Sequence, residues 1–500
     1  MSSPVEPVQH AIVVGGGIGG LMSALALSHR GIAVTVLERD PAPPPIEDYA
    51  DSLHWRRAGV PQALFPHFFM GRLYELLQAR YPALLVAFRA AGAEESGLTD
   101  YLHPLALKRY RPQPGDARLR SICCRRTTFE MVVRKYVAGQ LHGAPVTIVS
   151  DADVRDLVFA DAGDAPGSDH AGTPRVGGVE VLVNGEPQVI RADAVVDASG
   201  RAGKLWNVLG DRQQVEQRDS GIWYFTRHYR LREGASFPKS AGVPGATFPD
   251  FIVGALQADN RTFTTTFQIY RDDKAVARAL RDPAHFQAMC MKVARIRPWV
   301  DPAVAEPTSE VFGFAQMDSY WRRLVIDGEP RVLGYYPVGD SAIRGNPKFG
   351  RGCTWASLSA HMLADELARS GTHAAHLVAY EAALVATFAA DWETMRAVDQ
   401  STEAAFAIST GRRMGTLGER VAMRLEVLVN RASLLEPAFF RELWGAYHGF
   451  QGMRAWLGKP AAILALVRSA LRWPLHARAL APLDGRPTRQ EMLGDAAAAQ

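Results

Sequence analysis

Cysteine is scarce in this chain of 500 residues, and the pattern of the four that are present argues against two classes of protein. Cys123, Cys124, Cys290 and Cys353 form no C-x-x-C pair and no Cys/His cluster at metal-ligand spacing. We therefore expect neither a disulfide-stapled secreted scaffold nor a structural metal site, and the sequence predicts no metal. Reduced thiols in a cytoplasmic protein are the expectation.

An excess of one charge and long hydrophobic runs are lacking as well. The 56 basic and 52 acidic residues give a net charge of +4, too small in so long a chain to indicate a nucleic-acid partner. Residues 1–10 have no basic region and no cleavage site, so we expect no secretion. The longest uncharged run, 11–27, is crowded with glycines and is not expected to span a membrane. The length predicts two or more packed lobes.

What is present is a glycine-rich turn near the N-terminus. Gly15, Gly17 and Gly20 fit G-x-G-x-x-G between an apolar run and a helix-forming segment. The first glycine permits a tight turn, the second lets backbone approach a pyrophosphate, and the third lets helix and strand pack closely. The next alternating strand ends at Glu38, whose carboxylate can accept a ribose hydroxyl. This order predicts a dinucleotide site, with an ordinary glycine-rich turn as the alternative.

A second glycine loop about 320 residues later has similar physics. Asp340 follows a short apolar strand, and Pro347, Gly350 and Gly352 precede a helix that stops near Gly371. A carboxylate at the strand end suits a hydroxyl-rich linker. Backbone N–H groups of the loop suit a ring system that develops negative charge.

Two further stretches place polar residues where ligands bind. The segment 121–137 predicts a helix with Arg125 and Arg126 at its start, where a cation opposes the helix dipole and is better suited to bind an anion. A buried strand ends in Asp197-x-x-Gly200, at the edge of the sheet where ligands of α/β proteins bind.

The pair Arg56-Arg57 leaves two interpretations equally open, namely a cation that holds phosphate or orients a ring system, and a solvated loop. The stretches 219–230 and 261–270 alternate and are rich in Thr, Tyr and Phe, which predicts antiparallel strands of a second sheet. Tyr224 and Phe225 fall on opposite faces of the first strand. One face should cover a core and the other a cavity, and the pattern does not say which.

The chain beyond residue 372 is predicted to be nearly all helix. Its most apolar part, 461–473, contains two arginines. Three interpretations remain open for this segment: a helix that covers the core, a wall at the mouth of a hydrophobic cavity, and peripheral contact with a membrane.

Taken together, GGGIGG, Glu38, Arg126, VVDASGR and GDSAIRGNPKFGRGC resemble, in this order, the glutathione-reductase-type FAD fold. The chain is similar to single-component flavoprotein monooxygenases of the para-hydroxybenzoate hydroxylase superfamily. The segments GVPQ with a following histidine, VVDASGR and DSGIWYFTRHYR resemble its polyketide and polyether epoxidase members. The resemblance covers about residues 1–370 in motif order, and beyond that only the helical character agrees.

The resemblance implies an α/β fold with three parts. A Rossmann-like FAD-binding lobe is expected from 1–52, 120–215 and 325–371, and an antiparallel-sheet substrate lobe from 53–119 and 216–324. A helical C-terminal region follows from 372 to 500.

The resemblance also implies the cofactor and its contacts. FAD is expected to contact Gly15, Gly17, Gly20, Glu38, Arg39, Arg126, Asp340, Pro347, Gly350 and Gly352. Asp197, Gly200 and Arg201 occupy the place of a second nucleotide or flavin contact, although the usual Asp-Gly pair is split here as Asp-Ala-Ser-Gly. Relatives often have His-x-His where this chain has Phe65 and His67. No catalytic side chain is assigned.

The implied reaction is transfer of one oxygen atom from a C4a-(hydro)peroxyflavin to a bulky, mainly apolar small molecule, by epoxidation or hydroxylation. O₂ is the oxidant, and NAD(P)H or a partner reductase supplies the electrons. Three alternatives remain: an FAD-dependent saturase or cyclase of the geranylgeranyl-reductase or lycopene-cyclase type, a flavin halogenase, and a non-catalytic carrier of the Rab-GDI type. The halogenase needs a lysine and a W-x-W segment, but no W-x-W occurs and Lys108 is the only lysine in 51–110.

Overall fold

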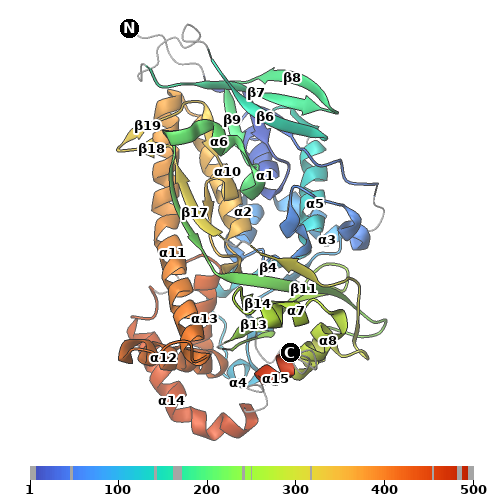
Figure 1. Ribbon diagram of the computed structural model, residues 1–500, viewed down its shortest axis with the longest axis vertical. Coiled ribbons are helices and arrows are strands. Elements are labelled where there is room, and N and C mark those ends of the chain that lie inside the picture. The colour runs from blue at the N-terminus through green and yellow to red at the C-terminus, as the bar shows by residue number, and fades with distance from the viewer. Residues whose placement is uncertain are drawn as a thin grey trace.

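The computed structural model describes residues 7–45, 49–139, 143–160, 172–238, 243–248, 250–315, 318–452, 455–480 and 487–493. Residues 1–6, on which the expectation of no secretion partly rests, lie outside these ranges. Figure 1 shows a parallel-sheet region above, an antiparallel sheet below it, and helices of the C-terminal region at the lower left. The predicted α/β class with a Rossmann-like region, antiparallel sheets and C-terminal helices is confirmed.

A parallel sheet in the order β20-β9-β1-β2-β5 carries the glycine-rich turn. Its strands are β1 (His10–Val14), β2 (Ala33–Leu37), β5 (Val146–Val149), β9 (Ala194–Asp197) and β20 (Tyr335–Pro337). All residues of β9 and the last four of β1 are buried. Because successive side chains of a strand point to opposite faces, both faces of this sheet are covered.

Helices and a meander supply the two covers. The helices are α1 (Ile18–Ser28), α5 (Arg126–Ala138) and α10 (Gly352–Leu367), with α2 (Gly71–Arg80) and α3 (Pro82–Ala90) beside them. The meander is β6 (Ala152–Phe159), β7 (Val176–Val183) and β8 (Glu186–Arg191), and β7 packs against β9. Asn184 and Gly185 both have positive φ, as a two-residue type I′ turn requires.

The segment 121–137, predicted to contain a helix with Arg125 and Arg126 at its start, is helical from Arg126 on, and a strand precedes the helix. Ser121–Cys123 form strand β4, which pairs with β3 (Glu94–Ser96), and helix α5 starts only at Arg126. All three residues of β4 are buried, so pairing with β3 satisfies backbone groups that an isolated helical turn would leave without partners.

The second sheet is antiparallel, in the order β12-β13-β14-β11-β15, and β16 also pairs with β11. Its strands are β11 (Ile222–Leu231), β12 (Gly245–Thr247), β13 (Phe251–Gln257), β14 (Thr262–Tyr270), β15 (Ala305–Pro307) and β16 (Phe312–Phe314). Phe225, Tyr229 and Phe267 point into a core shared with Phe286 and Met289 of helix α8 (Pro283–Lys292). Tyr224 and Thr266 line a cavity on the other face, which settles the choice that the alternation left open.

The remaining elements cover this sheet or connect the two sheets. The small helices are α4 (Pro104–Leu107), α6 (Leu205–Leu209), α7 (Lys274–Ala279), α8 (Pro283–Lys292), α9 (Arg297–Val300) and α15 (Arg489–Leu493). A connecting sheet contains β10 (Gln214–Asp219), β17 (Asp318–Arg323) and β21 (Ile343–Arg344), and β18 (Val325–Ile326) pairs with β19 (Glu329–Pro330).

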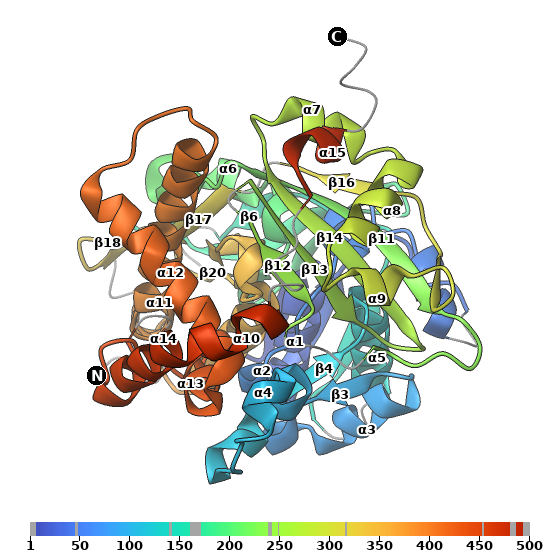
Figure 2. The ribbon, with the colours of Figure 1, turned by 90° about the horizontal axis from the view of Figure 1, so that it is seen from below.

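The C-terminal region is helical as predicted, and it returns the chain to the antiparallel sheet. Its helices are α11 (His373–Ser409), α12 (Leu417–Leu435), α13 (Pro437–Tyr447) and α14 (Pro460–Leu480). The long α11 runs down one side of the molecule and brings the chain to the antiparallel-sheet end (Figure 1). Figure 2 shows α12, α13 and α14 grouped beside α11 at that end.

Candidate functional site

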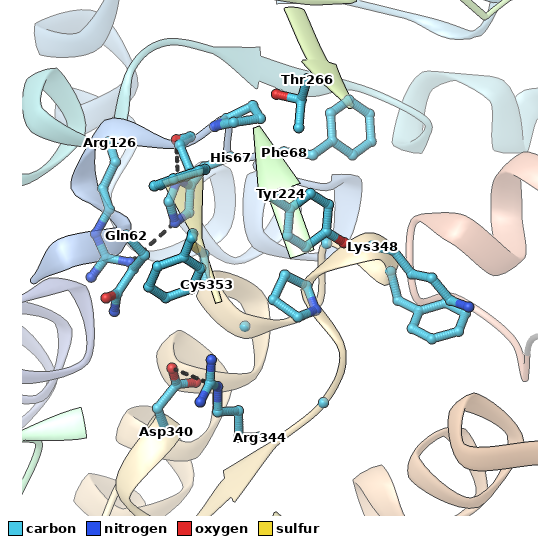
Figure 3. Close-up of a pocket in the computed structure, with 18 of the residues that line it drawn as sticks. Gln62, His67, Phe68, Arg126, Tyr224, Thr266, Asp340, Arg344, Lys348 and Cys353 are labelled. Atoms are coloured by element: carbon cyan, nitrogen blue, oxygen red, sulfur yellow. Dashed lines mark hydrogen bonds and ion pairs between the residues drawn. The ribbon is translucent and has the colours of Figure 1, made fainter. Parts of the chain in front are cut away.

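A cavity of about 1590 Å³ opens where the parallel sheet, the antiparallel sheet and the C-terminal helices meet. Pockets for a single small ligand usually measure about 300–1,000 Å³, so this one has room for a dinucleotide and a second molecule. Gly15 and Gly17 lie at one end, and aromatic side chains line the other. Figure 3 shows part of the wall between these ends.

The glycine-rich turn forms one end of the cavity. Gly15 has φ of +100°, and a Cβ there would lie 2.6 Å from the carbonyl oxygen of Ala198. The following helix, α1, has no acidic residue in its first turn, and its N-cap is Gly17, which has no side chain to cap it. The first N–H groups of α1 therefore remain available to an anion.

Gly20 has a different role from the other two glycines. A Cβ on Gly20 would lie 1.8 Å from the carbonyl oxygen of Gly15, so only glycine lets α1 pack on the turn. Gly20 is buried and is not among the residues that line the cavity. Gly20 therefore affects the site through the packing of α1 on the turn and not by lining the cavity.

Glu38 is fixed at the cavity wall by three donors. Its Oε2 accepts hydrogen bonds from the backbone N–H of Gly16 at 2.8 Å and from Arg57 at 2.7 Å. Its Oε1 accepts one from the N–H of Asp40 at 2.9 Å. Each carboxylate oxygen can accept about two hydrogen bonds, so Oε1 keeps a place for a hydroxyl. Arg39, next in the chain, is exposed and lines the same cavity.

Arg57 fits neither of the two interpretations that the sequence left open. Its guanidinium is fully buried and pairs with Glu38, Asp40 and Glu130. Burial acts to lower the pKa of Arg57, but the three carboxylates outweigh it and the pKa is raised. Arg57 holds Glu38 in place and reaches neither solvent nor the cavity, whereas Arg56 is exposed.

Arg126 faces the glycine-rich turn from the start of α5. Its Nε donates to Glu130 at 2.7 Å, and its Nη1 donates to Nε2 of His67 at 3.1 Å (Figure 3). Nδ1 of His67 donates to the carbonyl oxygen of Phe65 at 2.9 Å, so the ring is neutral and carries its proton on Nδ1. Burial and the adjacent Arg126 lower the pKa of His67 to about 3.

The two arginines at the start of α5 are separated by the fold. Arg125 is buried, and its guanidinium pairs with Asp259 in the turn between β13 and β14. It does not line the cavity, whereas Arg126 does. Only Arg126 is placed to meet an anion, while Arg125 connects α5 to the antiparallel sheet.

The second glycine loop lines the same cavity as the first, and the helices that follow the two loops, α1 and α10, pack against each other. Asp340, Pro347, Gly350 and Gly352 line the wall, and Gly350 has φ of +65°. The carboxylate of Asp340 lies 4.0 Å from Arg344, below the loop in Figure 3. Helix α10 starts at Gly352 with no side-chain cap and no acidic residue in its first turn, so a second set of N–H groups faces the cavity.

The prediction that Asp197 contacts a nucleotide or flavin needs correction. Asp197 is fully buried and is not part of the cavity wall. Its carboxylate accepts hydrogen bonds from the N–H of Ser199 at 2.9 Å, from the hydroxyl of Ser341 at 3.1 Å, and from the hydroxyl of Tyr335. Asp197 therefore shapes the turn whose Gly200 and Arg201 do line the cavity.

The far half of the cavity is largely apolar, and the C-terminal helices form much of its wall. The aromatic and aliphatic side chains there include Phe68, Tyr101, Phe248, Leu434, Phe440, Leu443, Trp444, Tyr447 and Trp473. Sequence reasoning missed α12 and α13 as part of the site. The aromatic-rich segment 437–447, PAFFRELWGAY, was a signal that could have pointed to them.

A short polar cluster interrupts this apolar half near the second glycine loop. The hydroxyl of Tyr224 donates to Gln268 at 3.1 Å and lies 3.5 Å from Asn346. Lys348 lies beyond Tyr224 in Figure 3, and its Nζ pairs with Asp399 at 2.7 Å. These groups offer hydrogen bonds to a substrate that is otherwise held by apolar contact.

Two observations bear on the alternative functions. Lys108 is exposed at the end of α4 and does not line the cavity. Within the described ranges, no group of three or more His, Cys, Asp or Glu residues is placed to hold a metal ion.

Comparison with known proteins gives one family model and one relative. Residues 13–44 match the model of an NAD(P)-binding Rossmann-like domain. Protein Rv3254 of Mycobacterium tuberculosis (strain ATCC 25618 / H37Rv) is 30% identical over 375 residues, which cover 71% of this chain and 72% of that protein.

Solved structures share the fold at lower identity. The flavin-dependent brominase Bmp2 superimposes with a TM-score of 0.57 at 14% identity, over 94% of this chain and all of that chain. PqsL, a probable FAD-dependent monooxygenase from Pseudomonas aeruginosa, gives a TM-score of 0.56 at 18% identity, over 80% of this chain and 99% of that chain. At these identities, the likeness establishes a common fold.

Proposed function

The chain belongs to the family of Protein Rv3254 and has the fold of the flavin-dependent monooxygenase superfamily, and from this premise we propose that it is an FAD-dependent monooxygenase. Its substrate would be a bulky, mainly apolar small molecule that gains one oxygen atom from O₂ by epoxidation or hydroxylation. The observation that carries the proposal is that a single cavity joins two glycine loops with uncapped helix N-termini to a large aromatic chamber.

The residues of the first glycine loop fit the adenosine half of FAD. Gly15, Gly17 and the N-terminus of α1 would hold the pyrophosphate, because a Cβ on Gly15 would obstruct the turn and the helix dipole favours negative charge. Glu38 would accept a ribose hydroxyl at its remaining acceptor position. The exposed Arg39 would lie beside the adenosine.

The remaining residues fit the flavin half. Arg126 would pair with the diphosphate. Neutral His67 accepts a hydrogen bond from Arg126 and would keep the Arg126 guanidinium directed toward the glycine-rich turn. The carboxylate of Asp340 would accept hydrogen bonds from hydroxyl groups of the ribityl chain. The Pro347–Gly352 loop and the N-terminus of α10 would lie beside the isoalloxazine and stabilise negative charge on it. The bound flavin itself supplies the activation of O₂.

The aromatic chamber would hold the substrate against the ring and exclude water. Phe440 and Trp444 of α13 provide apolar contact, while Tyr224 provides a hydrogen bond that fixes orientation. We propose NAD(P)H as the electron donor, with Gly200 and Arg201 near its approach, and a partner reductase as the alternative. The buried, unpaired cysteines suit a reducing cytoplasm, where we place the protein.

A halogenase is the second candidate, because the brominase Bmp2 shares the fold over nearly the whole chain. The missing W-x-W segment argues against it, as does the exposed position of Lys108 outside the cavity. The lysines that do line the cavity are Lys204 and Lys348, and Lys348 is paired with Asp399. A saturase or cyclase would use the same flavin site without consuming O₂.

The test is an ¹⁸O₂ experiment with the FAD-reconstituted protein. NADH, NADPH and chemically reduced flavin are supplied in separate arms, with apolar polyenes and polycyclic aromatics as candidate substrates and bromide present throughout. A product that contains one ¹⁸O atom supports the proposal. Product formed under nitrogen would indicate a saturase or cyclase, a brominated product a halogenase, and failure to bind FAD a carrier.

A further inference from the structure

The solvent-facing side of α14 is apolar over most of its length. Four residues at a spacing of four, Ile463, Val467, Leu471 and Leu475, are 51%, 51%, 74% and 80% exposed. Leu464 lies beside them at 53%. The buried side of the same helix carries small residues such as Ala462, Ala465 and Ser469. A helix packed only for a water-soluble fold has the reverse arrangement.

A second apolar stripe lies on α12, which packs against α14. Leu417, Val421 and Leu425 follow one another at a spacing of four and are 81%, 56% and 45% exposed. Met414, just before the helix, is 82% exposed. The two packed helices thus expose more apolar side chains than scattered surface residues explain, and exposed apolar surfaces mark interaction sites.

The charge of this region selects the kind of partner. Residues 412–480 contain 11 Lys and Arg but only 4 Asp and Glu, while the whole chain has a net charge of only +4. Helix α14 has arginines at 468, 472 and 478 and no acidic residue. Arg468 and Arg472 flank the apolar stripe and pair with Glu436 on its inner side, which leaves Arg478 exposed at the helix end.

We propose that the apolar stripes of α12 and α14 seat this protein on an anionic phospholipid surface. The leucines and valines would enter the acyl boundary, and the arginines would meet the phosphates of the headgroups. The helices would lie in the interface, since among the described residues no helix is both long and apolar enough to cross a bilayer. The excess of basic over acidic residues in 412–480 favours an anionic lipid surface over a second, equally basic copy of the chain.

Both helices that carry the stripes also contribute to the cavity wall. Val427 of α12 is 47% exposed and lines the cavity, as does Trp473 of α14. Arg431 stacks over the Trp473 ring at 4.3 Å. The helical spacing puts Val427 and Trp473 on other faces of α12 and α14 than the exposed stripes, so the two helices lie between the proposed membrane surface and the cavity.

Vesicle sedimentation tests the proposal with the full-length protein. Wild type is mixed with vesicles of phosphatidylcholine alone or of equal parts phosphatidylcholine and phosphatidylglycerol. We expect sedimentation with the anionic vesicles, weaker binding to the neutral ones, and release as salt is raised. The variant Leu471→Glu/Leu475→Glu should bind anionic vesicles about tenfold or more weakly, because it removes two inserted leucines and adds two negative charges.

A matched control removes two exposed apolar residues elsewhere and adds the same charge. Val86→Glu/Val189→Glu alters residues on α3 and β8 that are 60% and 56% exposed, and it should bind like wild type. Failure of wild type to sediment with anionic vesicles, or equal loss in both variants, would overturn the proposal. So would a wild-type dimer that only the α14 variant dissociates and that binds no vesicles. Should the α14 variant not fold, Arg478→Gln and the salt dependence of wild type decide. The assay measures no turnover, so its failure leaves the proposed oxygenase activity untouched.

Discussion

The guanidinium of Arg351 donates a 2.6 Å hydrogen bond to the carbonyl oxygen of Ala446 and so joins the second glycine loop to the end of α13. It also donates to the carbonyl oxygen of Tyr447 at 2.9 Å, and its side chain is only 2% exposed. A cation at the C-terminus of a helix meets the negative end of the helix dipole. Because α10 begins beside Arg351 and α13 lines the aromatic chamber, this contact sets the distance between the two halves of the cavity.

Replacing Arg351 with methionine tests that connection. We expect the free energy of unfolding to fall by about 2–4 kcal/mol, because two buried carbonyls lose their partner. Hydrogen exchange in 437–447 should accelerate more than in α1. The control Arg413→Met breaks an exposed ion pair with Glu419 and should leave the free energy of unfolding nearly unchanged. Unchanged exchange in α13 would show that other contacts hold the helix.

Replacing Gly17 and Gly20 with alanine should have different effects, although the two glycines are only three positions apart. In Gly20→Ala the new Cβ would meet the carbonyl oxygen of Gly15 at 1.8 Å, so we expect unfolding to become easier by about 1–3 kcal/mol or more. In Gly17→Ala the nearest atom is Arg126 Nη2 at 3.6 Å, so the fold should tolerate the change. FAD affinity should nevertheless fall in Gly17→Ala, because the Cβ occupies the space beside Arg126. Urea unfolding and flavin fluorescence measure the two effects separately.

Removing the carboxylate of Glu38 should weaken FAD binding. We expect Glu38→Ala to lose about 1.5–3 kcal/mol of binding free energy, the value of a hydrogen bond to a charged group. Flavin fluorescence quenching gives the dissociation constant of FAD. A thermal melt of the apoprotein measures how much stability the fold loses with the Arg57 pair, so that this loss can be told apart from weaker FAD binding. Glu75→Ala, in an exposed pair with Arg118, is the matched control. FAD affinity equal to wild type would mean that the ribose is held elsewhere.

Glu381 on α11 should make stability depend on pH. Burial raises the pKa of Glu381 from 4.5 to about 7, although its carboxylate accepts hydrogen bonds from the N–H groups of Leu324 and Val325. The folded protein then holds this proton more tightly than the unfolded chain. Its stabilising contribution is full below about pH 4.5 and is lost as pH rises through about 7, for a change of up to about 3 kcal/mol.

The variant Glu381→Gln should remove this part of the pH dependence. Urea unfolding of wild type and variant at about pH 5 and about pH 8 should show the variant gaining relative stability at the higher pH. The substitution Glu393→Gln alters an exposed carboxylate of the same helix and serves as the control. Its free energy of unfolding should depend on pH as that of wild type does. Identical pH profiles for wild type and Glu381→Gln would contradict the prediction.

Local sequence was enough to predict the elements whose conformation depends only on neighbouring residues. The strand–glycine–helix order around Gly15, the alternation through Tyr224 and Phe225, and the helical character beyond 372 follow from backbone sterics and from the periodicity of side chains. The α/β class is confirmed on that basis. The helix predicted within 121–137 starts at the arginine pair as expected. Strand β4 at Ser121–Cys123 was not predicted, because it pairs with a strand that precedes it by more than 20 positions.

Long-range packing decided the rest. Asp197 was expected to contact a ligand, and Arg57 was left open between a ligand contact and a solvated loop. The partners Tyr335 and Ser341 hold Asp197 in the interior, and Asp40 and Glu130 hold Arg57 there. Burying a charged group is tolerated only beside such partners, and no local pattern reveals them.

The residue pattern along the chain is enough to predict a dinucleotide-type turn, two kinds of sheet and a helical C-terminal region. The side of β11 that lines the cavity, and the contribution of α12, α13 and α14 to the cavity wall, depend on how the elements pack. A glycine turn is fixed by the conformations of its own few residues, whereas a cavity wall exists only where elements far apart in the chain pack around the same space.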